Sequence, residues 1–168
     1  MKVHRYYLEI NSIENLNTVK PPDKNLMIQK IDPPNIELNK FFYKNVGNQH
    51  RWVDRLVWDN FKWSNYLENK NVMTFILKLS DDLVGYCEVI NDQSNQSTEI
   101  AYFGILKNFI GRKFGGYFLF EAIKKCFDLN SNRVWVHTCT LDHKHALKNY
   151  QSRGMRIFKE ETININIV

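Results

Sequence analysis

Four of the seven glycines in this 168-residue chain fall within thirteen positions, and two basic residues stand between the last three of them. These residues are Gly104, Gly111, Arg112, Lys113, Gly115 and Gly116. A glycine-lined turn that leads into a helix directs several unpaired N–H groups at one point, where the helix dipole favours negative charge. The turn therefore predicts a site for a phosphate-bearing ligand. The alternative is a tight turn that only packs the helix against a strand.

The pattern around this turn excludes two common phosphate-binding loops. The Walker pattern needs Lys and then Ser or Thr after its last glycine, whereas Tyr117 follows Gly116, and the dinucleotide pattern G-x-G-x-x-G does not occur. Positive charge nevertheless gathers nearby, since residues 1–106 carry a net charge of −1 and residues 107–168 carry +6. An anionic cofactor or a nucleic acid would explain this asymmetry, and a solvated basic face is the alternative.

The hydrophobic pattern predicts the elements that hold the turn in place. Apolar and branched residues indicate strands at residues 3–10, 27–31, 72–79, 83–90, 99–106, 133–140 and 155–168, the first of them at a sheet edge. Helical spacing indicates helices at residues 36–46, 53–67, 114–129 and 143–153. The order is β-β-α-α-β-β-β-α-β-α-β, which predicts a mixed α/β domain in which a meander of hairpins leads into a strand-turn-helix unit.

Composition favours one soluble domain over residues 1–168. The chain is 43% hydrophobic and 14% aromatic, which is too apolar for a disordered protein, and its longest apolar stretches are far too short to span a membrane. The first residues lack the apolar region of a secretory signal. Three cysteines at unpatterned positions, Cys87, Cys126 and Cys139, fit a reducing compartment. We therefore expect a cytoplasmic protein.

Several segments, in a fixed order, resemble the GNAT superfamily of acetyl-CoA-dependent N-acetyltransferases, and more narrowly an uncharacterised bacterial group within it. The segments are EIAYFGI (99–105), FIGRKFGGYFL (109–119), RVWVHTCTLD (133–142), ALKNY (146–150), Gly154-Met155, and Val46-Gly47 with Trp52-Val-Asp-Arg55. The resemblance implies an α+β type of α/β fold: a central mixed, mostly antiparallel sheet whose fourth and fifth strands splay apart, flanked by about four helices. Residues 1–35 would supply N-terminal strands and a loop, and residues 98–158 the core motifs.

The resemblance also implies acetyl-CoA as co-substrate. The family's pyrophosphate pattern, Q/R-x-x-G-x-G/A, falls on residues 110–115, with Ile110 in place of Gln or Arg and Lys113 in place of Gly. Lys113 implies that this position either does not need a positive φ or tolerates the strain. Pantetheine would lie in the gap between the splayed strands. The expected cofactor-binding residues are Phe103, Gly104, Ile105, Gly111, Arg112, Lys113, Phe114, Gly115, Gly116, His143 and Tyr150.

Acetyl transfer to an amine benefits from a base, an oxyanion donor and an acid for the departing thiolate. The resemblance places Glu99 where some relatives carry the base and Tyr150 where many carry the acid, and a backbone N–H near Ile105 would polarise the carbonyl. The alternatives are that Glu99 only faces solvent and that Tyr150 only packs against the sheet. His137 or a chain of waters is the alternative base.

An aromatic and basic stretch precedes the third predicted strand. In relatives of this fold the first two helices wall the acceptor site, so Trp52, Arg55 and Trp58, together with His137, are expected to bind the acceptor. An arginine there would favour a carboxylate or phosphate on the acceptor. The alternative is an aromatic helix that packs on the sheet, with Arg55 held in an ion pair.

A second cluster, His137, Cys139, His143 and His145, matches a zinc site only weakly because a second cysteine pair is missing. We expect no metal.

Together these features predict an enzyme that transfers acetyl from acetyl-CoA to a primary amine of an unidentified small molecule or peptide, by direct attack in a ternary complex. The alternative is a catalytically idle acyl-CoA-binding sensor. Nucleic acid and membrane are not expected partners, because the basic residues cluster at one turn and along helices rather than among exposed aromatics. Residues 162–168 alternate in polarity and could pair within the sheet or across a homodimer, so the oligomeric state stays open.

Overall fold

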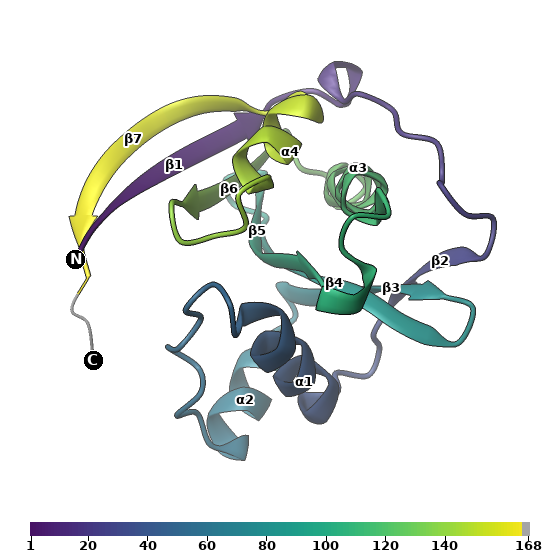
Figure 1. Ribbon diagram of the computed structural model, residues 1–168, viewed down its shortest axis with the longest axis vertical. Coiled ribbons are helices and arrows are strands. Elements are labelled where there is room, and N and C mark those ends of the chain that lie inside the picture. Colours follow the sequence, from purple (N-terminus) through teal and green to yellow (C-terminus); the bar gives the residue numbers. More distant parts are fainter. Residues whose placement is uncertain (166–168) are drawn as a thin grey trace.

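Residues 1–165, which the computed structural model describes, form a seven-stranded mixed sheet in the order β2-β3-β4-β5-β6-β1-β7 (Figure 1). The strands are β1 (Lys2–Ile10), β2 (Leu26–Lys30), β3 (Val72–Leu79), β4 (Asp82–Asp92), β5 (Ser97–Ile105), β6 (Arg133–Cys139) and β7 (Arg156–Asn164). The α-helices are α1 (Ile36–Gly47), α2 (Asn60–Leu67), α3 (Phe114–Phe127) and α4 (Ala146–Ser152). This order of elements confirms the predicted fold class.

Two neighbouring central strands separate where the functional motifs lie. β5 and β6 are parallel and pair only from Ser97–Ile100 to Arg133–Val136. On its other side β5 pairs with β4 as far as Ile105, with a register shift that leaves Ala101 outside the ladder. From Ala101 to Ile105 the edge of β5 that faces β6 therefore has no strand partner within the described residues. Glu99, which the resemblance places at the start of the family's fourth strand, lies on β5, so the family's fourth and fifth strands are β5 and β6, and their predicted splay is confirmed.

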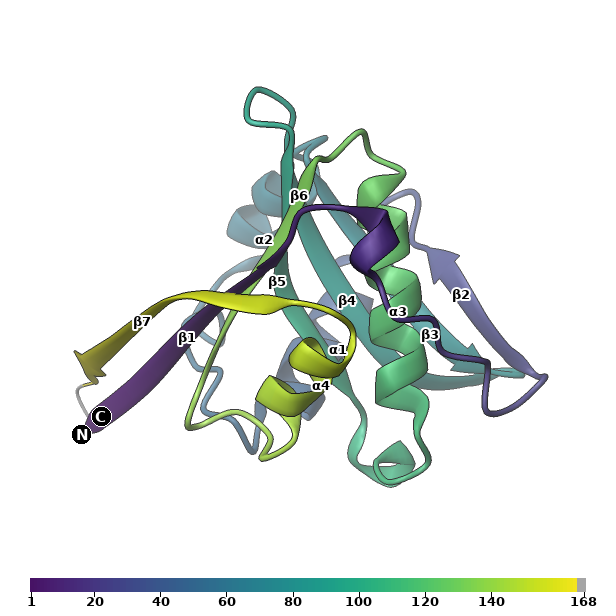
Figure 2. The same ribbon diagram turned by 90° about the horizontal axis from the view of Figure 1, so that it is seen from above.

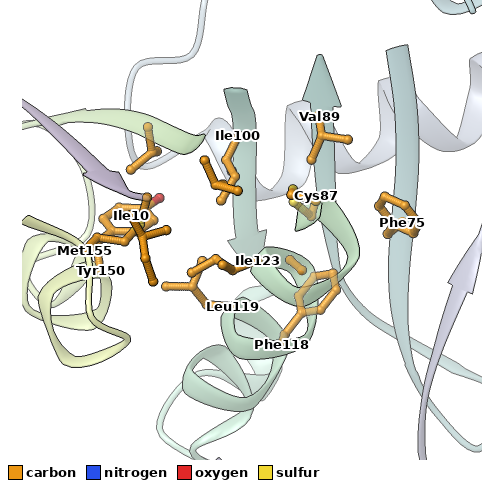
Figure 3. Packing of buried hydrophobic residues seen from close by; sticks show 14 of the residues in the cluster. Ile10, Phe75, Cys87, Val89, Ile100, Phe118, Leu119, Ile123, Tyr150 and Met155 are labelled. Atoms are coloured by element: carbon orange, nitrogen blue, oxygen red, sulfur yellow. The ribbon is translucent and has the colours of Figure 1, made fainter. Parts of the chain in front are cut away.

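Helices cover both faces of the sheet: α3 and α4 lie on one face, and α1 and α2 on the other (Figure 1). The buried stripe of α3 recurs at helical spacing and includes Phe118, Leu119 and Ile123, which pack against Cys87, Ile100 and other strand residues (Figure 3). On the opposite face, Phe42 of α1 stacks on Tyr86 of β4 with ring centroids 5.1 Å apart. An apolar layer thus packs against each face of the central strands.

The predicted helix at residues 53–67 is wrong in its first half. α2 begins only at Asn60, because the Asp59 carboxylate accepts a hydrogen bond from the Lys62 backbone N–H and caps the helix there. Before this cap the chain forms turns, and Val57 is 87% exposed rather than part of an apolar face. The three acceptor candidates of this stretch consequently lie on the connection between α1 and α2 and not on a helix.

Two further expectations at the end of the sheet need correction or completion. β1 is not an edge strand, because β7 pairs antiparallel with it along its length (Figure 2). Residues 162–164 of the alternating tail belong to this pairing within the sheet, while residues 166–168 lie outside the described residues. Within residues 1–165, no helix is both long and apolar enough to cross a membrane.

Candidate active site

An open cleft of about 1790 Å³ lies where β5 and β6 separate. Its walls come from β5, from the turn and first residues of α3, from the end of β6 with α4, and from the connection between α1 and α2. All of the predicted site residues line this cleft except Arg112 and Trp58. Arg112 instead lies over the Phe114 ring, 4.8 Å from its centroid, and Trp58 packs edge-on against Trp63.

One end of the cleft is the glycine turn, which we define as residues 110–116. Gly111 has φ +86°, and a Cβ there would meet no atom within 4 Å, so the backbone conformation and not crowding favours glycine. Lys113 adopts φ +65° just before α3, and its side chain makes no capping hydrogen bond. Of the two alternatives for Lys113, the structure shows the positive φ. The first N–H groups of α3 are left without a side-chain cap.

Basic side chains from other segments line the same cleft as the glycine turn. Lys148 and Arg153 of the α4 region line the cleft together with Lys20. Arg153 Nη1 donates to the Gly116 carbonyl at 3.2 Å, which ties α4 to the first turn of α3, while its buried Nε has no hydrogen-bond partner within residues 1–165. Uncapped helix N–H groups in a cleft that is also lined by cations form a site suited to an anion.

Glu99 and His137 lie on the face of the sheet opposite α3. Glu99 is in register with Trp135 on β6, and His137 follows two positions later on the same face. Burial, together with the Glu88 carboxylate, raises the pKa of half-buried Glu99, and Arg55 opposes this. His137 opens onto the cleft, and its partial removal from solvent, followed by the charge of Arg5, lowers its pKa. The raised pKa makes Glu99 a stronger base than an ordinary carboxylate, and the lowered pKa favours the neutral form of His137, which can accept a proton.

Tyr150 reaches the cleft from the other face. It is 7% exposed, belongs to the cluster between the sheet and α3, and meets Phe103 edge-on at 6.5 Å (Figure 3). Burial raises the pKa of its hydroxyl far above the usual value, so the phenol keeps its proton at neutral pH. The two candidate bases and the candidate acid thus approach the gap between β5 and β6 from opposite faces.

The aromatic end of the cleft holds Arg55, which is only 8% exposed. Its Nη1 lies 2.9 Å and 3.0 Å from the two carboxylate oxygens of Glu88, which also accepts a hydrogen bond from the Tyr66 hydroxyl. Five rings surround the guanidinium, belonging to Tyr43, Trp58, Trp63, Tyr66 and Tyr102. Of the alternative interpretation, the structure shows the ion pair of Arg55, with a partner 33 positions away that local sequence did not reveal, but Arg55 does not lie on a helix.

One cleft residue that sequence reasoning missed is Arg5 of β1. No motif surrounds it, and only the register of β1 against β6, Arg5 with Cys139 and Tyr7 with His137, brings it to the site. Residues 1–165 contain no group of three or more His, Cys, Asp or Glu that could hold a metal. Cys87, Cys126 and Cys139 are all free thiols.

The model of the acetyltransferase (GNAT) family matches residues 35–155, well over half of the chain. The chain belongs to the GNAT family. No curated protein matches its sequence.

Solved structures share the GNAT fold with this chain. A GCN5-related N-acetyltransferase from Sphaerobacter thermophilus superposes with a TM-score of 0.71 at 14% identity, over 94% of this chain and 49% of that one. An acetyltransferase from Bacillus subtilis in complex with CoA superposes with a TM-score of 0.59 at 21% identity, over 78% of this chain and 76% of that one. An aminoglycoside acetyltransferase from a soil metagenomic sample, in complex with sisomicin, superposes with a TM-score of 0.66 at 14% identity, over 79% of this chain and 90% of that one. The chain spans only about half the length of the first of these proteins.

The GNAT match begins at residue 35 and includes the glycine turn, Glu99, His137 and Tyr150. β1 and β2 precede it. Arg5 and Lys20 therefore add to the cleft from outside the matched part of this GNAT domain.

Proposed function

We propose that this GNAT domain transfers the acetyl group of acetyl-CoA to a primary amine. The observation that carries the proposal is the single cleft in which the glycine turn, the unpaired edge of β5 and the proton-transfer candidates Glu99, His137 and Tyr150 converge. Family membership supports acyl transfer, and the similar Bacillus subtilis acetyltransferase was solved with CoA. We place this activity in the cytoplasm.

The residues of the glycine turn fit a diphosphate. Space at Gly111 admits an anion close to the backbone, the uncapped N–H groups of α3 point to it, and Lys113, Lys148 and Arg153 supply positive charge. His143 lines the same cleft. The free edge of β5 at residues 103–105 offers backbone hydrogen bonds to the amides of pantetheine. Bound there, acetyl-CoA supplies a thioester carbonyl that an amine can attack.

Transfer forms a bond between the acceptor nitrogen and the carbonyl carbon and breaks the bond between that carbon and sulfur. An alkylamine has a pKa of about 10.4, so it must lose a proton before or during attack. Glu99 or His137 receives this proton, directly or through water. Tyr150, which is protonated at neutral pH, donates to the departing thiolate. A backbone N–H near Ile105 stabilises the developing oxyanion.

A thermal-shift titration tests the binding half of the proposal. Acetyl-CoA and CoA at about 100 times their dissociation constants should stabilise the domain by about 2.7 kcal/mol, which corresponds to roughly 5–10 °C, and ATP should not. Lys148→Gln should reduce the shift, whereas Lys124→Gln, which removes the same charge from an exposed site on α3 outside the cleft, should not.

Release of CoA in the presence of a panel of amines tests the transfer half. Formation of an acetylated product from any amine supports the proposed acetyltransferase activity. A clear thermal shift without transfer to any amine would assign the domain as an acyl-CoA sensor. Absence of a shift with both acetyl-CoA and CoA would show that the domain does not bind this cofactor.

A further inference from the structure

Arg5, Arg51 and Arg55 line the cleft outside the α4 region, and Arg5 and Arg55 differ sharply in how their charges are balanced. Arg55 is buried and neutralised by Glu88 at 2.9 Å. Arg5, whose side chain is 30% exposed, has only contacts at the outer limit of hydrogen bonding: its Nη1 lies 3.5 Å from the Tyr7 hydroxyl and 3.9 Å from Glu161. Its Nε is buried and has no partner within residues 1–165. A guanidinium has five N–H donors, so most of those on Arg5 are available.

Within residues 1–165, the carboxylate that forms an ion pair with Arg5 is that of Glu161, and it is already engaged by other groups. Glu161 accepts a hydrogen bond from the Tyr7 hydroxyl at 2.5 Å and lies 3.6 Å from Lys159 Nζ. Asp142, farther along the same wall, accepts hydrogen bonds from the Thr138 hydroxyl and the Cys139 N–H. Among the described residues, Arg5 therefore has only the shared Glu161 carboxylate at 3.9 Å to balance its charge, and the balance is partial.

Arg5 also stands beside the place where an amine would lose its proton. β1 and β6 are antiparallel with Tyr7 opposite His137 and Arg5 opposite Cys139, so Arg5 and His137 are diagonal neighbours on one face. Such neighbours are about 7–8 Å apart between Cα atoms, within reach of a long side chain. Arg5 lowers the pKa of His137, second to burial, which is consistent with this proximity.

We propose that the acceptor is an amine that carries a carboxylate a few bonds from its nitrogen, as in an amino acid, and that Arg5 binds this carboxylate. The proposal rests on the proposed acetyl transfer. A planar guanidinium edge matches the two oxygens of a carboxylate. The partial balance by Glu161 favours a group with one negative charge over a doubly charged phosphate. Arg5 thus takes the role that local sequence suggested for Arg55.

The test compares each of the twenty amino acids with its amide and with its decarboxylated amine, at saturating acetyl-CoA. We expect kcat/KM for the best amino acid to exceed that of its matched amide at least tenfold. Arg5→Gln should lower kcat/KM for that amino acid roughly 10- to 100-fold, mainly through KM, because charge-assisted hydrogen bonds are lost. It should leave the amide and the amine nearly unchanged, and Arg5→Lys should retain part of the preference.

Lys2→Gln is the matched control, because it removes one positive charge from the exposed start of the same strand, outside the cleft. Equal or better transfer to amides and decarboxylated amines would overturn the inference while leaving acetyl transfer intact. So would an Arg5→Gln variant that loses activity equally on all three acceptor series. Absence of transfer to any amine would instead overturn the proposed function together with this inference.

Discussion

The glycine-turn end and the aromatic end of the cleft both contain positive charge, but they hold it in opposite ways. At the glycine turn, the first N–H groups of α3 have no side-chain cap, and Lys113 lines the cleft beside them. At the aromatic end, Arg55 is enclosed by rings and neutralised by Glu88 from a distant strand. This contrast is the reason why we propose Arg5 and not Arg55 as a binding group: a buried carboxylate neutralises Arg55, whereas the charge of Arg5 is only partly balanced.

The largest effect should follow from breaking the buried ion pair. Arg55→Met leaves Glu88, which is 1% exposed, without a countercharge and should lower the free energy of unfolding by about 3–5 kcal/mol. Replacing both residues, as in Arg55→Met with Glu88→Leu, should recover much of this loss. Chemical denaturation provides the measurement. The control is Arg133→Met, because the ion pair of Arg133 with Glu9 is partly exposed. This substitution should lower the free energy of unfolding by less than about 1 kcal/mol. Equal losses in both variants would show that the two pairs do not differ as proposed.

Next in size is the removal of the candidate acid, which stands between the two ends. Tyr150→Phe keeps the ring packed against Phe103 but deletes the hydroxyl. We expect kcat to fall on the order of 10³-fold, with little change in the dissociation constant of acetyl-CoA. Steady-state kinetics and a binding titration separate the two quantities. Tyr117→Phe on the adjacent helix, outside the cleft, should keep its activity. Full turnover in Tyr150→Phe would remove this hydroxyl from the mechanism.

The pH dependence of kcat/KM identifies the base. Since only the unprotonated form accepts a proton, activity should fall as the pH drops through the pKa of the base. For Glu99 this pKa is raised above 4.5, and for His137 it is lowered below 6.5. Glu99→Gln should lower kcat/KM on the order of 10²-fold and abolish the fall of kcat/KM at low pH, while His137→Gln should preserve that fall. If the fall of kcat/KM at low pH disappears in His137→Gln and persists in Glu99→Gln, His137 is the base. If it persists in both variants, a chain of waters removes the proton.

The smallest effect concerns the left-handed backbone at the glycine turn. Lys113→Gly and Lys113→Ala remove the same charge, but only glycine adopts φ +65° without strain, so the glycine variant should be about 1 kcal/mol more stable. Both should weaken the salt dependence of acetyl-CoA binding equally. Thermal unfolding and titrations at two salt concentrations test this. Lys124→Ala should leave the salt dependence unchanged. Equal stability of the two Lys113 variants would mean that the turn relaxes to another conformation.

Much of the fold could be predicted because local patterns and tertiary packing agree. The stripe on α3, the aromatic and branched residues of β1 and the glycines before α3 each specify one kind of element whatever surrounds them. The prediction failed where a single hydrogen bond outweighed an apolar pattern: capping by Asp59 starts α2 seven residues later than the pattern of residues 53–67 suggested. It also failed for the place of β1, since the pairing of β7 with β1 depends on register and not on composition.

By itself, the sequence determined the order of elements and the glycine turn, because periodicity, glycine and nearby basic residues act over a few positions. Only the tertiary structure decided how the charges in the cleft are balanced. The pairing of Arg55 with Glu88 and the position of Arg5 beside His137 both depend on strands that are far apart along the chain and adjacent in the sheet. Electrostatic balance depends on distances in space, which is why arginines that look alike in sequence have different roles at this site.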